Sequence, residues 1–85
     1  MKEFDFTVTD ELGIHARPAG MLVKIAKKYQ SSIKIKKDSK EALATSLLSM
    51  MSLNIKKGDN VKVVTDGADE DAAYEEVLDF FSKNL

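Results

Sequence analysis

Two spacings of apolar residues alternate along this 85-residue chain, and their order constrains the fold more than any other sequence feature. A spacing of two, typical of strands with one buried face, occurs in residues 3–8, 32–37, 41–44 and 61–65. Spacings of three and four, typical of amphipathic helices, occur from residue 16 to 27 or 28, from 47 to 53 and from 69 to 85. The resulting order, β-α-β-β-α-β-α, predicts an α+β fold in which one sheet carries all its helices on one face.

The alternation within a strand also predicts which side chains are buried. In the last predicted strand, Val61, Val63 and Thr65 share the face that is expected in the core. Lys62 and Val64 share the face that is expected in solvent. The second and third strands are separated by a short turn, close enough for an antiparallel hairpin. The spacing alone leaves the order and direction of the remaining strands open.

The composition is that of one small globular domain, with 44% hydrophobic and 32% charged residues. The net charge of −1 argues against a nucleic-acid-binding protein, whose domain is normally basic. There is no cysteine, and residues 1–6 carry acidic side chains where a secretion signal has an apolar run. No apolar stretch approaches the length of a membrane span. We therefore expect a single cytoplasmic domain over residues 1–85, without membrane insertion.

The segment Gly13-Ile14-His15-Ala16-Arg17-Pro18-Ala19 contains the only histidine, the only arginine and the only proline of the chain. Proline is well tolerated in the first turn of a helix, where backbone N–H groups have no intrahelical partner. The helical spacing of apolar residues begins at the same place. The pattern therefore predicts His15 at or beside the N-cap of a helix, with Arg17 in its first turn.

A histidine in this position is a candidate acceptor for a phosphoryl group. The unpaired N–H groups and the positive dipole end of a helix attract anions, and Arg17 adds a cation that pairs well with phosphate. A neutral imidazole also has a nucleophilic nitrogen available near pH 7. The alternative is a histidine that is only a cap or a surface residue. With no second histidine and no cysteine we expect no metal site, and no second catalytic group of a hydrolase stands out.

The short helix predicted over residues 47–53 is too apolar for an ordinary surface helix. Ser46 is a good N-cap residue, and Asn54 can adopt the left-handed conformation that ends a helix. On a helical projection the large side chains fall on two faces, one with Leu47, Leu48 and Met51 and the other with Met50 and Leu53. Either one face is exposed for docking to a partner or both are buried, and the spacing does not decide between them.

Three segments of the chain resemble the histidine-containing phosphocarrier (HPr) family of the bacterial phosphoenolpyruvate-dependent sugar phosphotransferase system. They are the histidine segment of residues 13–19, Met50-Met51-Ser52-Leu53 with Lys57-Gly58-Asp59, and Gly67-Ala68-Asp69-Glu70. The resemblance runs over the whole chain. It implies an open-faced β-sandwich, with a four-stranded antiparallel sheet covered on one face by three helices.

The resemblance also implies a phosphoryl carrier rather than an enzyme. Enzyme I would take the phosphoryl group from phosphoenolpyruvate and place it on Nδ1 of His15, which would pass it to a sugar-specific IIA domain. Arg17 would be the cation beside the phosphoryl group, and the backbone at Ala16 and Arg17 would help to hold its oxygens. No cofactor is expected, and the family default is a monomer.

Partner docking and regulation follow from the same resemblance. Met21, Leu47, Leu48 and Met51 match the family's apolar docking ring, which selects this face of the short helix as the exposed one. Lys24 and Lys27 would lie at its rim and attract acidic partners. Ser46 corresponds to the serine that HPr kinase/phosphorylase modifies in many relatives, and its phosphate would add negative charge to the docking patch. The alternative function is a regulatory adaptor of the same fold, acting mainly through phosphorylated Ser46 bound to a catabolite-control transcription factor.

Overall fold

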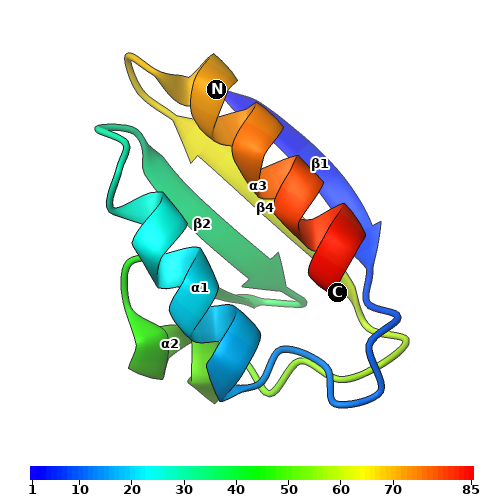
Figure 1. The fold of residues 1–85 in the computed structure, drawn as a ribbon. Coiled ribbons are helices and arrows are strands. Elements are labelled where there is room, and N and C mark those ends of the chain that lie inside the picture. The colour runs from blue at the N-terminus through cyan, green and yellow to red at the C-terminus, as the bar shows by residue number, and fades with distance from the viewer.

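The computed structural model describes all of residues 1–85. Its elements are β1 (Lys2–Thr7), α1 (Ala16–Ala26), β2 (Ser32–Lys37), β3 (Lys40–Leu43), α2 (Leu47–Ser52), β4 (Asn60–Asp66) and α3 (Glu70–Asn84). This is the predicted order, β-α-β-β-α-β-α. The four strands form one antiparallel sheet in the order β1-β4-β2-β3, so the predicted hairpin of β2 and β3 is confirmed (Figure 1).

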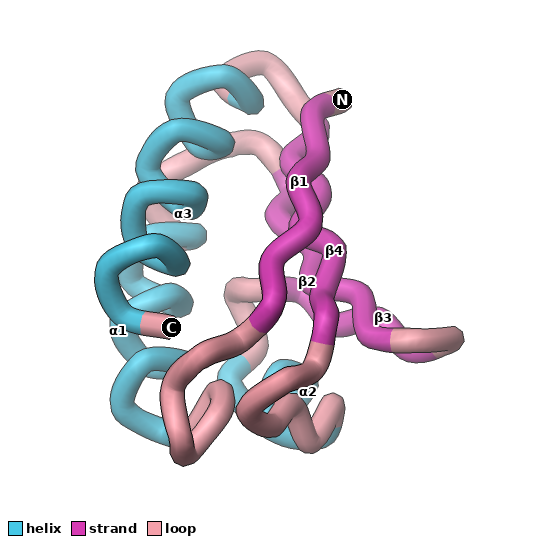
Figure 2. The backbone as a smooth tube through the Cα atoms, turned by 90° about the vertical axis from the view of Figure 1, so that its right-hand side faces the viewer, coloured by secondary structure: helices cyan, strands magenta, loops and turns pink.

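The helices leave one face of the sheet open. Figure 2 shows α1 and α3 on the same side of the strands, and these two helices contact each other. The short helix α2 lies at one end of the sheet, where it packs against α1 and β3. The longest helix, α3, has 15 residues, and none of the helices combines the length and apolar character needed to cross a membrane.

One cluster of buried apolar side chains fills the space between the sheet and the helices. Phe81 of α3 is fully buried, and its ring meets those of Phe4 and Phe6 edge to face, with centroid distances of 5.6 and 5.4 Å. Such aromatic pairs contribute about 0.5–1.5 kcal/mol beyond the area that they bury. The first strand and the last helix therefore close the core together.

The expected exposure of Val64 is wrong. Its side chain lies on the open face of the sheet, as the alternation requires, but the residue is buried. β4 is a central strand, and Val64 is directly opposite Glu3 on β1 and Lys34 on β2. Side chains of directly opposite residues lie in contact distance, and the apolar stem of a lysine covers neighbouring apolar surface. Position in the centre of the sheet, which the spacing does not reveal, buries this valine.

The first two helices end slightly earlier than the spacing predicts. α1 ends at Ala26, with Lys27 as its C-cap residue, and α2 ends at Ser52, with Leu53 as its C-cap residue. Asn54 follows with a φ of +54°, which confirms the predicted left-handed conformation. Because this conformation stops the helix, the chain turns away toward β4.

Candidate functional site

His15 is the N-cap residue of α1, as predicted. Its backbone is extended, with φ −107° and ψ −175°, and its side chain makes no capping hydrogen bond. The loop before it is held tightly, because the N–H of Ile14 donates to the backbone oxygen of Ile55 at 3.1 Å. Gly13 has a φ of +67°, and a Cβ at this position would lie 2.1 Å from the same oxygen. The glycine therefore allows the close approach that places the histidine at the start of the helix.

The first turn of α1 presents free backbone donors beside the imidazole. The N–H of Ala19 bonds back to the His15 oxygen at 3.0 Å, which starts the helical ladder. The N–H groups of Ala16 and Arg17 make no hydrogen bond within the chain. Pro18 comes next and has no N–H to satisfy, so its place in the first turn is confirmed. The helix therefore opens on two unpaired donors and the positive end of its dipole.

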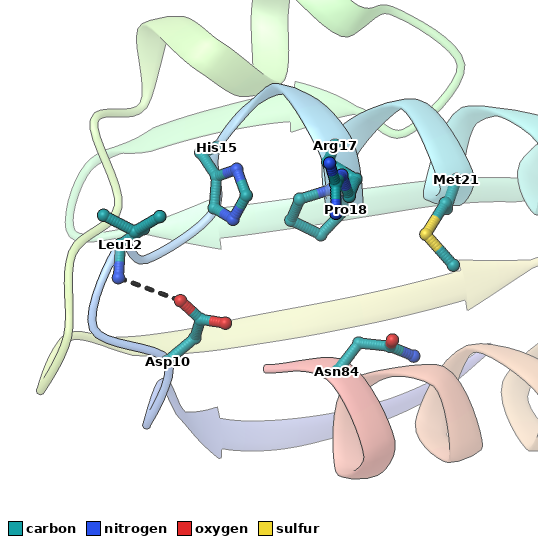
Figure 3. Close-up of a pocket in the computed structure, with 7 residues that line it drawn as sticks. All are labelled: Asp10, Leu12, His15, Arg17, Pro18, Met21 and Asn84. Carbon is teal, nitrogen blue, oxygen red and sulfur yellow. Dashed lines mark hydrogen bonds between the residues drawn. The ribbon is translucent and has the colours of Figure 1, made fainter.

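His15 is half-buried at the edge of an open depression with a volume of about 310 Å³. The residues that line it come from the loop before α1, from the first turns of α1 and from the end of α3 (Figure 3), namely Asp10, Leu12, His15, Arg17, Pro18, Met21 and Asn84. A shallow hollow of this kind leaves the imidazole within reach of a group carried by another protein.

Asp10, Leu12 and Asn84 also line this depression, and none of them was predicted as a site residue. The Leu12 N–H donates to Oδ1 of Asp10 at 2.8 Å, a local turn that aspartate commonly makes with the backbone two residues on (Figure 3). That spacing could have indicated the position of Asp10. Asn84 arrives from the other end of the chain, and no local pattern indicates that it belongs here.

Arg17 is exposed, and its guanidinium forms neither a salt bridge nor a hydrogen bond within the chain. By contrast, six lysines elsewhere in the protein are paired with carboxylates. An unpaired guanidinium on the first turn of a helix is free to bind an oxyanion in two-point fashion. No group of three or more histidine, aspartate or glutamate side chains is arranged to hold a metal ion.

The two faces of α2 separate as predicted. Met50 and Leu53 are buried, whereas Leu47, Leu48 and Met51 are exposed, Leu48 to 83%. Met21 of α1 is exposed as well, and it lines the depression beside His15. α1, which carries Met21, packs against α2, which carries the other three side chains. We call Met21, Leu47, Leu48 and Met51 the apolar ring.

Three further residues of the sequence-based hypothesis belong to the same two helices and their caps. Lys24 and Lys27 are exposed along α1 and its C-cap. Ser46 is the N-cap residue of α2, and its Oγ accepts a hydrogen bond from the Ser49 N–H at 3.3 Å. The predicted N-cap role of Ser46 is confirmed, and the residue is half-buried.

Comparisons with known proteins agree over nearly the whole chain. The family model described as the PTS HPr component phosphorylation site matches residues 2–83. The phosphocarrier protein HPr of Lysinibacillus sphaericus is 44% identical over 75 residues, which are 88% of this chain and 85% of that protein. The crystal structure of HPr-C-His from Thermoanaerobacter tengcongensis matches with a TM-score of 0.91 at 36% identity, covering 96% of this chain and 92% of that one.

A dimer of HPr from the same organism matches with a TM-score of 0.77 at 36% identity, covering 98% of this chain and 95% of that one. The expected monomer is thus not confirmed. The fold is confirmed as an open antiparallel sheet with three helices, and the family match extends across the His15 segment. The chain therefore belongs to the HPr family of phosphocarrier proteins of the phosphotransferase system.

Proposed function

We propose that this phosphocarrier accepts its phosphoryl group on Nδ1 of His15 from phosphorylated enzyme I and delivers it to sugar-specific IIA domains. The position of His15 carries this proposal. It is a half-buried imidazole at the open start of α1, with unpaired N–H groups at Ala16 and Arg17 next to it. The relay acts in the cytoplasm, where phosphoenolpyruvate is formed.

The chemistry of the relay is a reversible exchange of one bond for another. A P–N bond forms on His15 as the bond between phosphorus and enzyme I breaks, and the electron pair of the broken bond stays on enzyme I. The N–H groups of Ala16 and Arg17 and the Arg17 guanidinium meet the phosphoryl oxygens. Transfer to the IIA domain repeats the exchange with His15 as the leaving group.

Docking uses the apolar ring, with Lys24 and Lys27 at its edge. Exposed methionine and leucine side chains adapt to different partner surfaces, as a carrier with many acceptors requires. The lysines favour acidic partners and raise the rate of encounter. The relay needs no cofactor, and we propose that the chain acts as a monomer, since each partner must reach His15.

The test is the intact mass of the chain after incubation with phosphoenolpyruvate and purified enzyme I. One added phosphoryl group that is lost in acid is expected in the wild type and absent in His15→Ala. That variant should fold normally, because it removes a side chain that makes no hydrogen bond. An unmodified wild-type chain beside a fully active enzyme I, or equal phosphorylation of His15→Ala, contradicts the proposal.

Ser46 is the proposed site of regulation. A phosphate at the N-cap of α2 is compatible with the helix, because the N-terminal dipole favours negative charge there. It would place that charge next to Leu47 of the apolar ring and disfavour acidic partners. Incubation with ATP and HPr kinase/phosphorylase should add an acid-stable phosphate to the wild type and none to Ser46→Ala.

The regulatory adaptor is the second candidate, and it is favoured if phosphorylated Ser46 binds a catabolite-control transcription factor while His15 stays unmodified. The same mass measurements, made with each phosphoryl donor in turn, separate the two functions.

A further inference from the structure

Asp10 places a carboxylate in the wall of the depression that His15 opens into. Figure 3 shows this carboxylate extending into the space between the imidazole and Asn84. Oδ1 is occupied by the Leu12 N–H at 2.8 Å. Oδ2 has no hydrogen-bond or ion-pair partner in the chain, although Arg17 lines the same depression. One carboxylate oxygen is therefore left free in the hollow.

The backbone holds this carboxylate in place. The Asp10 N–H donates to the backbone oxygen of Leu85 at 2.9 Å, and the Asp10 oxygen accepts from the Gly13 N–H at 2.9 Å. With the Leu12 bond to Oδ1, three hydrogen bonds fix the residue on both sides of its Cα. The side chain therefore keeps its place when a new negative charge enters the hollow.

We infer that Asp10 is a positioning residue that raises the transfer potential of the phosphoryl group on His15 by opposing its charge. This inference rests on the proposed phosphorylation of His15. A phosphoryl group carries close to two negative charges. Arg17 and the free N–H groups attract these charges and stabilise the phosphorylated histidine. The fixed carboxylate of Asp10 acts against them. Attraction by Arg17 and repulsion by Asp10 together leave phosphohistidine stable enough to persist between partners and reactive enough to transfer its phosphoryl group.

The rate of phosphohistidine hydrolysis reports on this effect, because destabilising the phosphorylated state lowers the barrier to its loss. Water attacks phosphorus, the N–P bond breaks, and its electron pair stays on the ring nitrogen, which takes up a proton as inorganic phosphate leaves. The Asp10 charge repels the phosphoryl oxygens and disfavours the phosphorylated state. Removal of the charge should therefore lengthen the lifetime of phosphohistidine.

The experiment uses Asp10→Asn, whose amide oxygen can still accept the Leu12 N–H. The chain is loaded chemically with phosphoramidate, which loses ammonia as its P–N bond breaks and a new one forms on His15, so the result does not depend on enzyme I. The half-life of phosphohistidine is followed at pH 7 by ³¹P NMR. We expect it to be about three- to tenfold longer in Asp10→Asn at low salt, with the difference shrinking at high salt as the charges are screened.

Two controls separate the local charge from other effects. Glu11→Gln removes the same charge from the neighbouring exposed residue, which does not line the depression, and should leave the half-life unchanged. Asp10→Ala removes both the charge and the Leu12 hydrogen bond, and should match Asp10→Asn. An unchanged half-life in Asp10→Asn, an equal change in Glu11→Gln, or a change in Asp10→Ala alone overturns the inference.

The phosphoramidate experiment also distinguishes the two proposals. A chain that phosphoramidate loads and enzyme I does not would contradict the relay and still report on Asp10. A chain that neither reagent loads on His15 contradicts both.

Discussion

The layer formed by α1 and α3 has two ends (Figure 1), and the polar groups at these ends are used in opposite ways. At the end where α1 finishes and α3 starts, which we call the closed end, the Asp69 carboxylate accepts from the N–H groups of Gln30 and Ser31 at 2.9 and 2.8 Å. It also accepts from the Ser31 hydroxyl. Nearby, the Glu76 carboxylate accepts from Tyr29 and from Lys28. Side chains here tie two loops and two helices together.

At the other end, where α1 starts and α3 finishes, the charged and nucleophilic groups are unpaired. We call this the open end. His15 and Arg17 make no side-chain hydrogen bond, and Asp10 leaves one oxygen free. No buried side-chain nitrogen or oxygen in the protein lacks a partner, so these free groups do not carry the cost of burial. The contrast indicates that the polar groups of the closed end support the fold, while those of the open end are left free for the proposed phosphoryl transfer.

The largest effect on stability is expected from a substitution at the closed end. Gly67 has a φ of +153°, and a Cβ there would lie 2.6 Å from Cα and Oγ of Ser31. Gly67→Ala should therefore cost about 2 kcal/mol of unfolding free energy, which lowers Tm by roughly 10 °C. Phosphoryl acceptance by His15 below the new Tm should be unchanged. Thermal unfolding by circular dichroism measures the stability, and the enzyme I mass assay measures the acceptance.

Gly20→Ala is the matched control for that prediction. Gly20 lies within α1 and does not require a positive φ, and a Cβ there would meet no atom within 4 Å. Alanine is the better helix former, so this change should raise stability by about 0.5–1 kcal/mol. Equal destabilisation by both substitutions would mean that the tight packing of Gly67 against Ser31 does not cause the loss of stability in Gly67→Ala.

The open end should respond in the opposite way, with loss of docking and little loss of stability. Met51 is exposed in the apolar ring, so Met51→Asp should weaken binding to enzyme I by about tenfold while Tm changes by only a few degrees. Titration calorimetry measures the affinity. Ser39→Asp adds the same charge to an exposed turn outside the ring and should bind normally. Unfolding of Met51→Asp would show that the side chain supports the core.

The contrast between the ends also explains what the sequence could reveal. His15 and Arg17 were predictable because they lie at the start of one helix. A helical projection is local, so it sorted the side chains of α2 into two faces, but the family resemblance was needed to select the exposed one. Asp10 and Asn84 line the same depression only because the end of α3 packs beside the loop between β1 and α1. The Asp69 bonds to Gln30 and Ser31 span nearly forty residues of sequence. Such contacts follow from packing of the whole chain and have no local pattern.

In the sheet, too, the local pattern could not reveal which distant strands pair. Spacing identified the strands, and the short connection identified the β2–β3 hairpin. The pairing of β1 with β4 joins strands that are far apart in the sequence, and it places β4 at the centre. Only that placement accounts for the burial of Val64.

A smaller effect should appear in acid. Hydrogen bonds from the Ser31 hydroxyl and the Gln30 N–H hold the pKa of Asp69 below its ordinary value of 3.8. The charged form is thus favoured in the folded state, and its contribution is complete above pH 3.8 and lost as the pH falls through the lowered pKa. Asp69→Asn should be less stable than the wild type at pH 7, and the two Tm curves should converge on acidification.

Asp38→Asn is the control for the acid measurement, because Asp38 lies exposed in the β2–β3 turn. Its Tm should run parallel to that of the wild type from pH 7 downward. A constant gap between Asp69→Asn and the wild type at every pH would show that the carboxylate charge does not contribute to the closed end.

The smallest effect concerns Tyr29. Its hydroxyl donates to the Glu76 carboxylate, which raises the pKa of Tyr29 to about 12 from an ordinary value of 10. The neutral form is favoured in the folded state, so this bond stabilises the fold fully below pH 10 and is lost as the pH rises toward 12. In Glu76→Gln the pKa of Tyr29 should fall toward 10, as followed by NMR of the labelled tyrosine Cζ. A pKa that stays near 12 would mean that burial rather than the Glu76 carboxylate protects the hydroxyl, and that the closed end is held together by packing more than by its charges.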